Sequence, residues 1–238
     1  MSEFLNVLTR TLAECGMTLD DAALGRLCRY DELLVEWNAV MNLTALTEPR
    51  DVALKHFADS LTVLRACEIP QGAAVIDVGT GAGFPGLVLK IARPDIRLTL
   101  LDSLKKRLNF LDTVCDELSL DGVVTVHSRA EDGARGELRD SFDIAVSRAV
   151  AELNVLAEYC LPYVKVGGRF IAMKGKDARE ELSAAENAIT ILCGQVTQQH
   201  TFHLAEAGER SIFEIIKTAP TPQKYPRKSK QIKSKPLT

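Results

Sequence analysis

Five apolar residues near the start of the chain recur at i, i+3, i+4, i+7 and i+11, which places them on one face of a helix of about 20 residues. They are Tyr30, Leu33, Leu34, Trp37 and Met41. Residues 18–21 precede this helix and have the form of a capping box that starts at Thr18. A second amphipathic helix is predicted over residues 52–67, after Pro49 and before Pro70. The chain is therefore expected to begin with a helical extension.

Beyond Gly72 the pattern changes to short, branched apolar runs that alternate with helical stretches. Strands are predicted over residues 74–78, 97–101, 123–127, 142–147 and 169–173, and helices over residues 85–93, 104–118 and 152–164. This alternation is typical of a parallel sheet with helices on both faces. Two last runs, 195–204 and 211–218, have a connection too short for a helical crossover, so they are predicted to form an antiparallel hairpin at one edge.

These elements predict an α/β, Rossmann-like fold with a mostly parallel, seven-stranded sheet. The length of 238 residues, with 46% hydrophobic and 26% charged residues, suits one domain of ordinary size and a modest extension. We divide the chain into a helical extension (1–70), a Rossmann-like domain (71–219) and a basic C-terminal tail (220–238). Apolar runs are far shorter than the roughly 20 residues of a membrane-spanning helix, so we expect a soluble, cytoplasmic protein without a membrane partner.

Six cysteines are scattered at wide intervals without a C-x-x-C pair, which fits reduced thiols used as small apolar side chains. His200 and His203 are close in a predicted strand, but two ligands do not make a zinc site. We therefore expect no metal.

Charge is unevenly distributed along the chain. The net charge is −3, yet the segment from Lys224 to the end holds six basic residues and no acid, which leaves 23 basic against 32 acidic residues in the body. A polyanionic partner that meets this tail would explain the asymmetry. A merely solvated end is the alternative.

The first predicted strand runs directly into a glycine-rich loop with the pattern D-x-G-x-G-x-G, from Asp77 to Gly83. Such loops let the backbone approach a ligand at the carboxyl end of a strand. A nicotinamide dinucleotide would place its pyrophosphate there, whereas S-adenosyl-L-methionine brings an ammonium and a sulfonium. Asp77 could accept a hydrogen bond from the ammonium, directly or through water, but would repel a pyrophosphate. The loop therefore favours S-adenosyl-L-methionine.

Asp102 ends the second predicted strand, about where an acid meets ribose hydroxyls in either class of enzyme. Its alternative role is that of an acid at a helix N-terminus. No G-K-[ST] follows the glycines, so nucleoside triphosphates are disfavoured. The terminal hairpin resembles methyltransferases more than dehydrogenases. An NAD(P)-dependent oxidoreductase and a non-catalytic RNA-binding assembly factor are the alternative functions.

The residues at the end of the fourth predicted strand limit which kind of base a methyltransferase with this sequence could methylate. It reads Ser147-Arg148-Ala149-Val150 and lacks the [DN]-P-P-[FYW] of enzymes that methylate adenine amines. Methylation of pyrimidine C5 needs a thiolate, and Cys160 follows an apolar helical pattern. Guanine N7 carries an in-plane lone pair and no proton, so its methylation needs alignment and no general base. We therefore assign no catalytic acid or base.

An ordered series of motifs over nearly the whole chain resembles the ribosomal RNA small-subunit methyltransferase G family, also called the glucose-inhibited division protein B family. The motifs are Trp37-Asn38, Asn42-Leu43-Thr44, His56-Phe57-Ala58-Asp59-Ser60-Leu61, Phe84-Pro85-Gly86, Leu101-Asp102-Ser103-Leu104-Lys105-Lys106-Arg107, Ser147-Arg148-Ala149, Met173-Lys174-Gly175 and Lys224-Tyr225-Pro226-Arg227. The resemblance implies methylation of a guanine N7 in 16S ribosomal RNA, with the RNA or the small subunit as partner. We expect a monomer.

The resemblance also implies cofactor contacts at Gly79, Phe84, Ala130, Glu131 and Arg148. Gly81 and Asp102 complete the predicted set of cofactor-binding residues from the loop and the second strand. At the end of the fourth strand, Arg148 could hold the methionine carboxylate or an RNA phosphate, with a surface ion pair as the alternative.

A protein with a net negative charge must bind RNA through local clusters of basic residues. Lys105, Lys106 and Arg107 at one helix start, Lys174 and Lys176 after the fifth strand, and the tail could form a basic rim, although the helix-start cluster is equally typical of a solvated face. His56, Asp59 and Ser60 are predicted either to shape the substrate pocket or to fasten the extension to the sheet.

Overall fold

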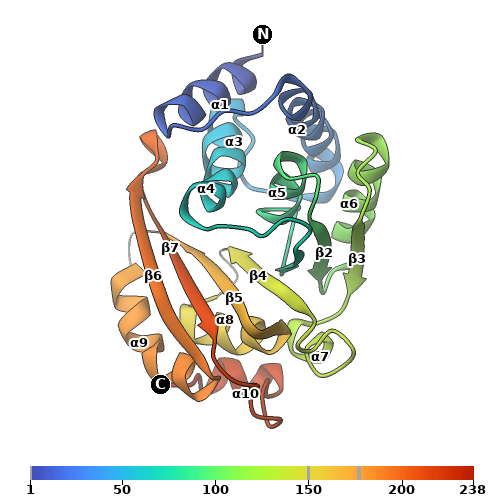
Figure 1. Ribbon diagram of the computed structural model, residues 1–238. Coiled ribbons are helices and arrows are strands. Elements are labelled where there is room, and N and C mark those ends of the chain that lie inside the picture. Colours follow the sequence, from blue (N-terminus) through green and yellow to red (C-terminus); the bar gives the residue numbers. More distant parts are fainter. Residues whose placement is uncertain (1, 149–150, 176–177) are drawn as a thin grey trace.

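The computed structural model describes residues 2–148, 151–175 and 178–238 (Figure 1). Seven strands form one sheet with the order β3-β2-β1-β4-β5-β7-β6. Strands β1 to β5 are parallel, and β7 runs antiparallel to both β5 and β6. The strands are β1 (Ala74–Val78), β2 (Arg97–Asp102), β3 (Val123–His127), β4 (Phe142–Arg148), β5 (Val164–Lys174), β6 (Gly194–His203) and β7 (Glu209–Lys217). The predicted α/β fold and its terminal hairpin are confirmed.

Strand β5 is longer than predicted, because it begins at Val164 rather than near Arg169. Gly167 and Gly168 interrupt the branched apolar pattern there, and Gly167 has a φ of +85°. A Cβ at Gly168 would lie 2.6 Å from the Asp143 carbonyl oxygen. The absence of a side chain at Gly168 thus lets β5 lie close to β4 at this point.

Helices cover both faces of the sheet, and successive residues of each strand point to opposite faces. Val75 packs in one hydrophobic cluster with the N-terminal helices, α5 (Gly86–Ala92) and α6 (Lys105–Glu117). Ile76 packs in a second cluster with α8 (Leu153–Cys160) and α9 (Ala178–Ile191). A short 3₁₀ turn, η2 (Leu161–Tyr163), links α8 to β5, and another, η3 (Ala205–Ala207), links β6 to β7.

Helix α9 was not predicted from the sequence. Its buried face is built mostly from alanines (Ala178, Ala185 and Ala188), with Ile189 as the one larger residue among those buried. Alanine gives only a weak apolar periodicity, which explains the omission. Two shorter helices, α7 (Ala130–Gly133) and α10 (Ser229–Ser234), were also not predicted.

The N-terminal extension forms α1 (Glu3–Glu14), α2 (Asp21–Met41) and a helical path of three parts. Those parts are α3 (Pro49–Val52), a π-helical segment η1 (Ala53–Ala58) and α4 (Asp59–Ala66), where one regular helix was predicted. Helix α2 is capped by Asp20 and not by Thr18, because the Asp20 carboxylate accepts a hydrogen bond of 2.7 Å from Ala23 N. Figure 1 shows these helices, in blue and cyan, grouped over α5.

The segment expected as a basic tail is packed against the domain. Tyr225 and Ile232 are buried, and the Arg227 guanidinium holds the buried Glu158 carboxylate at 2.7 Å (Nη2 to Oε2) and 2.9 Å (Nε to Oε1). Arg139 donates hydrogen bonds to the carbonyls of Thr221 and Tyr225. The C-terminal segment therefore belongs to the folded structure.

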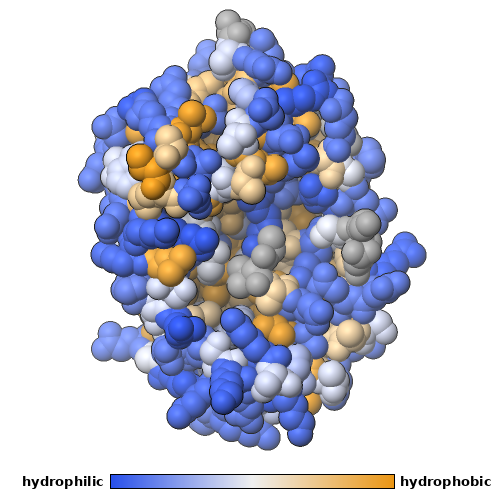
Figure 2. All heavy atoms as spheres, turned by 180° about the vertical axis from the view of Figure 1, so that it is seen from behind, coloured by the Kyte–Doolittle hydropathy of each residue, from blue (hydrophilic) through white to orange (hydrophobic). Residues whose placement is uncertain are grey.

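The surface is largely hydrophilic on the face drawn in Figure 2, where the described apolar side chains form small separate groups. Within the described ranges, no helix combines the length and apolar character needed to cross a bilayer.

Candidate active site

A cavity of about 470 Å³ opens at the carboxyl ends of β1, β2 and β4. It is bounded by the glycine loop, the ends of these strands, helix α7, the extension and the C-terminal segment. Its lining includes Leu43, Thr44, His56, Val78, Gly79, Thr80, Gly81, Ala82, Phe84, Leu101, Asp102, Ser103, Arg107, Ser128, Arg129, Ala130, Glu131, Arg148, Ala151, Tyr159, Ser229 and Lys233. All seven residues predicted from the sequence as cofactor contacts are therefore brought together here.

The glycine loop turns sharply after β1 because three of its glycines have left-handed backbone. Gly79, Gly81 and Gly83 have φ values of +75°, +61° and +99°. Gly79 and Gly81 line the cavity, whereas a Cβ at Gly83 would collide with the Tyr30 hydroxyl. That hydroxyl donates to the carbonyl of Ala82. Tyr30 of the N-terminal extension thus helps to fix the backbone conformation of the glycine loop.

Asp77 lies beneath the loop and does not line the cavity, so the water-mediated contact with a ligand ammonium fits its position better than the direct one, and both stay predictions. Its Oδ2 accepts hydrogen bonds of 2.8 Å from Thr80 Oγ1 and from Gly86 N. The carboxylate is fully buried, and its Oδ1 has no partner among the described residues. Burial raises the pKa of Asp77 to about 6. Asp77 therefore holds the glycine loop together.

Asp102 has the predicted position of an acid at a helix N-terminus, and its contact with ribose hydroxyls stays a prediction. Its Oδ1 accepts from Leu104 N at 2.8 Å at the start of α6, and its Oδ2 accepts from Gly81 N at 3.0 Å. Arg107 Nη1 lies 3.3 Å from the same Oδ2. The carboxylate links the glycine loop to α6 and also lines the cavity.

Glu131 is a buried acid in the cavity wall, with 5% of its surface exposed. No described residue donates a hydrogen bond to its carboxylate, and the side chain lines the cavity. The neighbouring Ala130 carbonyl accepts from Tyr163 Oη at 2.6 Å. A ligand that brings hydroxyl or amino groups would complete the pairing of Glu131.

The C-terminal segment also reaches this cavity through Ser229 and Lys233. Tyr159 Oη lies 3.5 Å from Ser229 Oγ, which connects the segment to α8. The sequence assigned these residues to a basic C-terminal tail and did not indicate that they reach the cavity, because Glu158, the buried partner of Arg227, lies far away in the chain.

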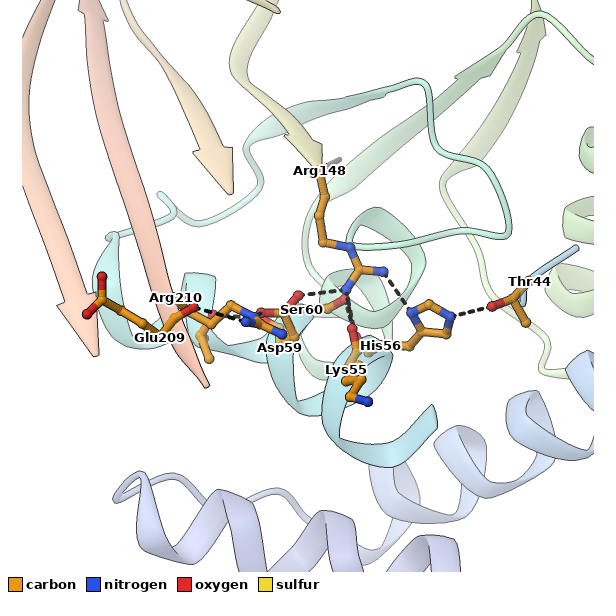
Figure 3. A network of polar contacts seen from close by, with 9 residues as sticks. Thr44, Lys55, His56, Asp59, Ser60, Arg148, Glu209 and Arg210 are labelled. Atoms are coloured by element: carbon orange, nitrogen blue, oxygen red, sulfur yellow. Dashed lines mark hydrogen bonds and ion pairs between the residues drawn. The ribbon is translucent and has the colours of Figure 1, made fainter. Parts of the chain in front are cut away.

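Arg148 fastens the extension to the end of β4, as Figure 3 shows. Its Nη1 donates to the Lys55 carbonyl at 2.9 Å and to Asp59 Oδ2 at 2.8 Å, and its guanidinium lies 5.2 Å from the centre of the Phe84 ring. The π-helical turn presents that carbonyl to the arginine. Asp59 Oδ1 accepts in addition from Arg210 Nε of β7 at 2.9 Å. The ion pair predicted as the alternative role of Arg148 is found, but it is largely buried and not at the surface.

His56 and Ser60 belong to the same network. His56 stacks on Phe84 with ring centres 4.5 Å apart, and Ser60 Oγ donates to the His56 carbonyl. Burial, with the positive charge of Arg148 as the second cause, lowers the pKa of His56 to about 4. The ring is therefore neutral at pH 7. His56 and Asp59 line cavity walls and fasten the extension, whereas Ser60 lines neither cavity; a part in shaping the substrate pocket stays a prediction.

A second cavity of about 610 Å³ adjoins the first and shares His56, Arg148 and Ala151 with it. Its walls carry the cations Lys55, Lys174 and Arg210 and the acids Asp59, Glu152 and Glu181. Lys174 is tied to the Ala151 carbonyl and to Glu181. Lys176, the other basic residue predicted there, lies outside the described residues.

The model of the family described as rRNA small subunit methyltransferase G matches residues 24–213. A protein of Alkaliphilus oremlandii named "Ribosomal RNA small subunit methyltransferase G" is 48% identical over 99% of both chains. A protein of the same name from Desulforamulus reducens is 50% identical over 88% of both chains.

Solved structures with low sequence identity share the fold. A SAM-dependent methyltransferase from Aquifex aeolicus is similar with a TM-score of 0.56 and 17% identity, over 74% of this chain and 97% of that one. A putative methyltransferase complex from Haloferax volcanii gives a TM-score of 0.59 at 14% identity, over 80% of this chain and 98% of that one.

Proposed function

The chain belongs to the rRNA small subunit methyltransferase G family, and from this premise we propose that it methylates N7 of one guanine in the small-subunit RNA. It is an S-adenosyl-L-methionine-dependent methyltransferase of 16S ribosomal RNA. The oxidoreductase alternative is thereby set aside. The choice of guanine N7 and the roles of single residues are our proposal.

The described residues fit S-adenosyl-L-methionine. Gly79 and Gly81 leave room for close approach of a ligand to the backbone, and the unpaired carboxylate of Glu131 suits donors such as ribose hydroxyls or an amine. The buried, unpaired Oδ1 of Asp77 suits a water-mediated contact with an ammonium. We propose that the cofactor-binding residues are Gly79, Gly81, Phe84, Asp102, Ala130, Glu131 and Arg148.

The cofactor supplies an electrophilic methyl group on a positively charged sulfur. The in-plane lone pair of guanine N7 could accept this methyl group without loss of a proton, so the residues that would hold the cofactor and the base need not include a general base. The protein's task is then to align the base and to exclude water. His56, Phe84 and Arg148 lie together between the two cavities and are suited to this task.

The observation that carries the proposal is the junction of the two cavities at His56 and Arg148. The first cavity joins the glycine loop to Asp102 and Glu131. We propose that a nucleic-acid strand enters through the second cavity, which is lined by basic and by acidic side chains. Exposed Lys105 and Lys106 lie at the start of α6, after the cavity-lining Ser103. We propose that the protein acts as a monomer in the cytoplasm, where ribosomes are assembled.

Transfer from labelled cofactor tests the proposal. Small ribosomal subunits from a bacterium that lacks the corresponding enzyme, and RNA extracted from them, would be incubated with the purified protein and digested to nucleosides. We expect label in 7-methylguanosine. Label in another nucleoside, or none on either substrate, would contradict the assignment and return the assembly-factor alternative.

A further inference from the structure

Thr44 lies in the loop between α2 and α3 and lines the first cavity beside His56. Its Oγ1 has two polar neighbours, Leu46 N at 3.0 Å and His56 Nε2 at 2.8 Å. The Leu46 amide can only donate. The hydrogen between Thr44 Oγ1 and His56 Nε2 can be carried by either atom. Its position decides whether the Thr44 hydroxyl can donate a hydrogen bond to a ligand.

Arg148 settles the position of that proton. Its Nη2 lies 3.2 Å from His56 Nδ1, on the side of the imidazole ring away from Thr44 (Figure 3). A guanidinium has no acceptor, so Nδ1 must present its lone pair to the arginine. The ring is neutral, because its pKa is lowered to about 4, and it therefore carries its single proton on Nε2. Nε2 then donates to Thr44 Oγ1.

The Thr44 oxygen thus accepts two hydrogen bonds, one from Leu46 N and one from His56 Nε2. A hydroxyl oxygen has two acceptor positions, and both are used. Its own hydrogen has no acceptor among the residues that the structure describes. Thr44 is therefore set to donate a hydrogen bond to a ligand and is unable to accept one.

This inference rests on the proposed function. We propose that the Thr44 hydroxyl donates a hydrogen bond to O6 of the methyl-accepting guanine and so selects guanine over adenine. Guanine presents the acceptor O6 next to N7, whereas adenine presents an amino donor at that position. A hydroxyl that can only donate forms a hydrogen bond with guanine O6 and cannot form one with the amino group of adenine. Arg148 and His56 are positioning residues that act through Thr44.

Three substitutions at two positions test the donor. Thr44→Val removes the hydroxyl and keeps the shape, Thr44→Ser keeps the hydroxyl, and Thr47→Val is the matched control, since Thr47 is exposed in the same loop. Methyl transfer to unmethylated small subunits would be followed in single turnover at saturating cofactor, with cofactor affinity measured by calorimetry. We expect Thr44→Val to slow transfer about tenfold at unchanged cofactor affinity. Thr44→Ser and Thr47→Val should stay near the wild-type rate.

Three results would overturn the role of Thr44. They are a wild-type rate for Thr44→Val, a Thr44→Ser variant as slow as Thr44→Val, and a loss of cofactor affinity that accounts for the loss of transfer. A wild-type product other than 7-methylguanosine contradicts the proposed function instead. A normal product with an unimpaired Thr44→Val variant contradicts only the present inference.

The relay through the imidazole has its own readout. His56→Phe keeps a ring to stack on Phe84 but cannot donate to Thr44. In the wild-type background, His56→Phe should slow methyl transfer. In the Thr44→Val background the same substitution should slow transfer little further, because the hydroxyl that His56 orients is already absent. An equal further loss in both backgrounds would contradict the relay.

Discussion

Arg148 Nη1 lies 2.8 Å from Asp59 Oδ2, and this pair joins the end of β4 to the N-terminal extension directly beside the cavity. The same carboxylate holds Arg210 of β7 at 2.9 Å. Three parts of the chain that are far apart in sequence thus meet on one buried acid. The extension is consequently a wall of the site as well as a cover for the sheet.

Asp59→Asn should destabilise the protein, because it leaves two largely buried guanidinium groups without a negative partner. We expect a loss of about 3 kcal/mol in the free energy of unfolding, measured with urea. Asp51→Asn is the control, since Asp51 pairs with Lys55 at the surface of the same helical path and should cost about 0.5 kcal/mol or less. Equal effects of the two substitutions would contradict the structural role of Asp59.

Asp77, which lies beneath the glycine loop, should make the free energy of unfolding depend measurably on pH. Its pKa is raised to about 6 in the folded protein, so the folded state holds a proton that the unfolded state has lost between about pH 4 and 6. The contribution of Asp77 to stability therefore falls as pH rises through this window and stays lost above it.

The stability difference between Asp77→Asn and the wild type isolates this effect from His56, whose lowered pKa of about 4 acts in the opposite direction. From pH 4 to pH 7 the variant should gain up to about 3 kcal/mol relative to the wild type. Urea unfolding of both proteins over this range is the measurement. A difference independent of pH would show that Asp77 titrates normally.

Glu131→Gln should weaken binding of S-adenosyl-L-methionine about tenfold in calorimetry, since a neutral amide is a poorer acceptor than a carboxylate for the ligand's donors. Folding should be little affected, because no described residue pairs with this acid. Asp132→Asn is the control, as Asp132 is adjacent, exposed and paired with Arg135 at the surface. Unchanged affinity in Glu131→Gln would remove Glu131 from the binding site.

Arg227→Met should loosen the C-terminal segment, because the substitution leaves the buried Glu158 carboxylate without its guanidinium. We expect a loss of about 3 kcal/mol in stability and weaker cofactor binding, since Ser229 and Lys233 of this segment line the cavity. Lys230→Met removes the same charge from an exposed position and should change neither quantity. If the Arg227→Met variant is destabilised but binds the cofactor with wild-type affinity, the C-terminal segment does not contribute to cofactor binding.

Strands β1 to β4 could be predicted from the sequence because each is a short run rich in apolar residues that ends at polar or glycine residues. Asp102 and Arg148 could be placed because the carboxyl ends of parallel strands meet at one edge, whereas Glu131 was implied by the family resemblance. The π-helical turn at Ala53–Ala58 could not be predicted, because its carbonyls gain their partner from Arg148 on a distant strand. Likewise, the docking of Arg227 depends on Glu158, which reads as an ordinary helix residue.

The most direct test of the central claim is a mass map of 16S RNA in a bacterium whose own family member has been deleted. Expression of this chain should restore 7-methylguanosine at one guanine, and the Gly79→Asp variant should not restore it, because the side chain strains the loop and fills its ligand side. No 7-methylguanosine after expression of the wild-type chain, or methylation at another atom, would contradict the account.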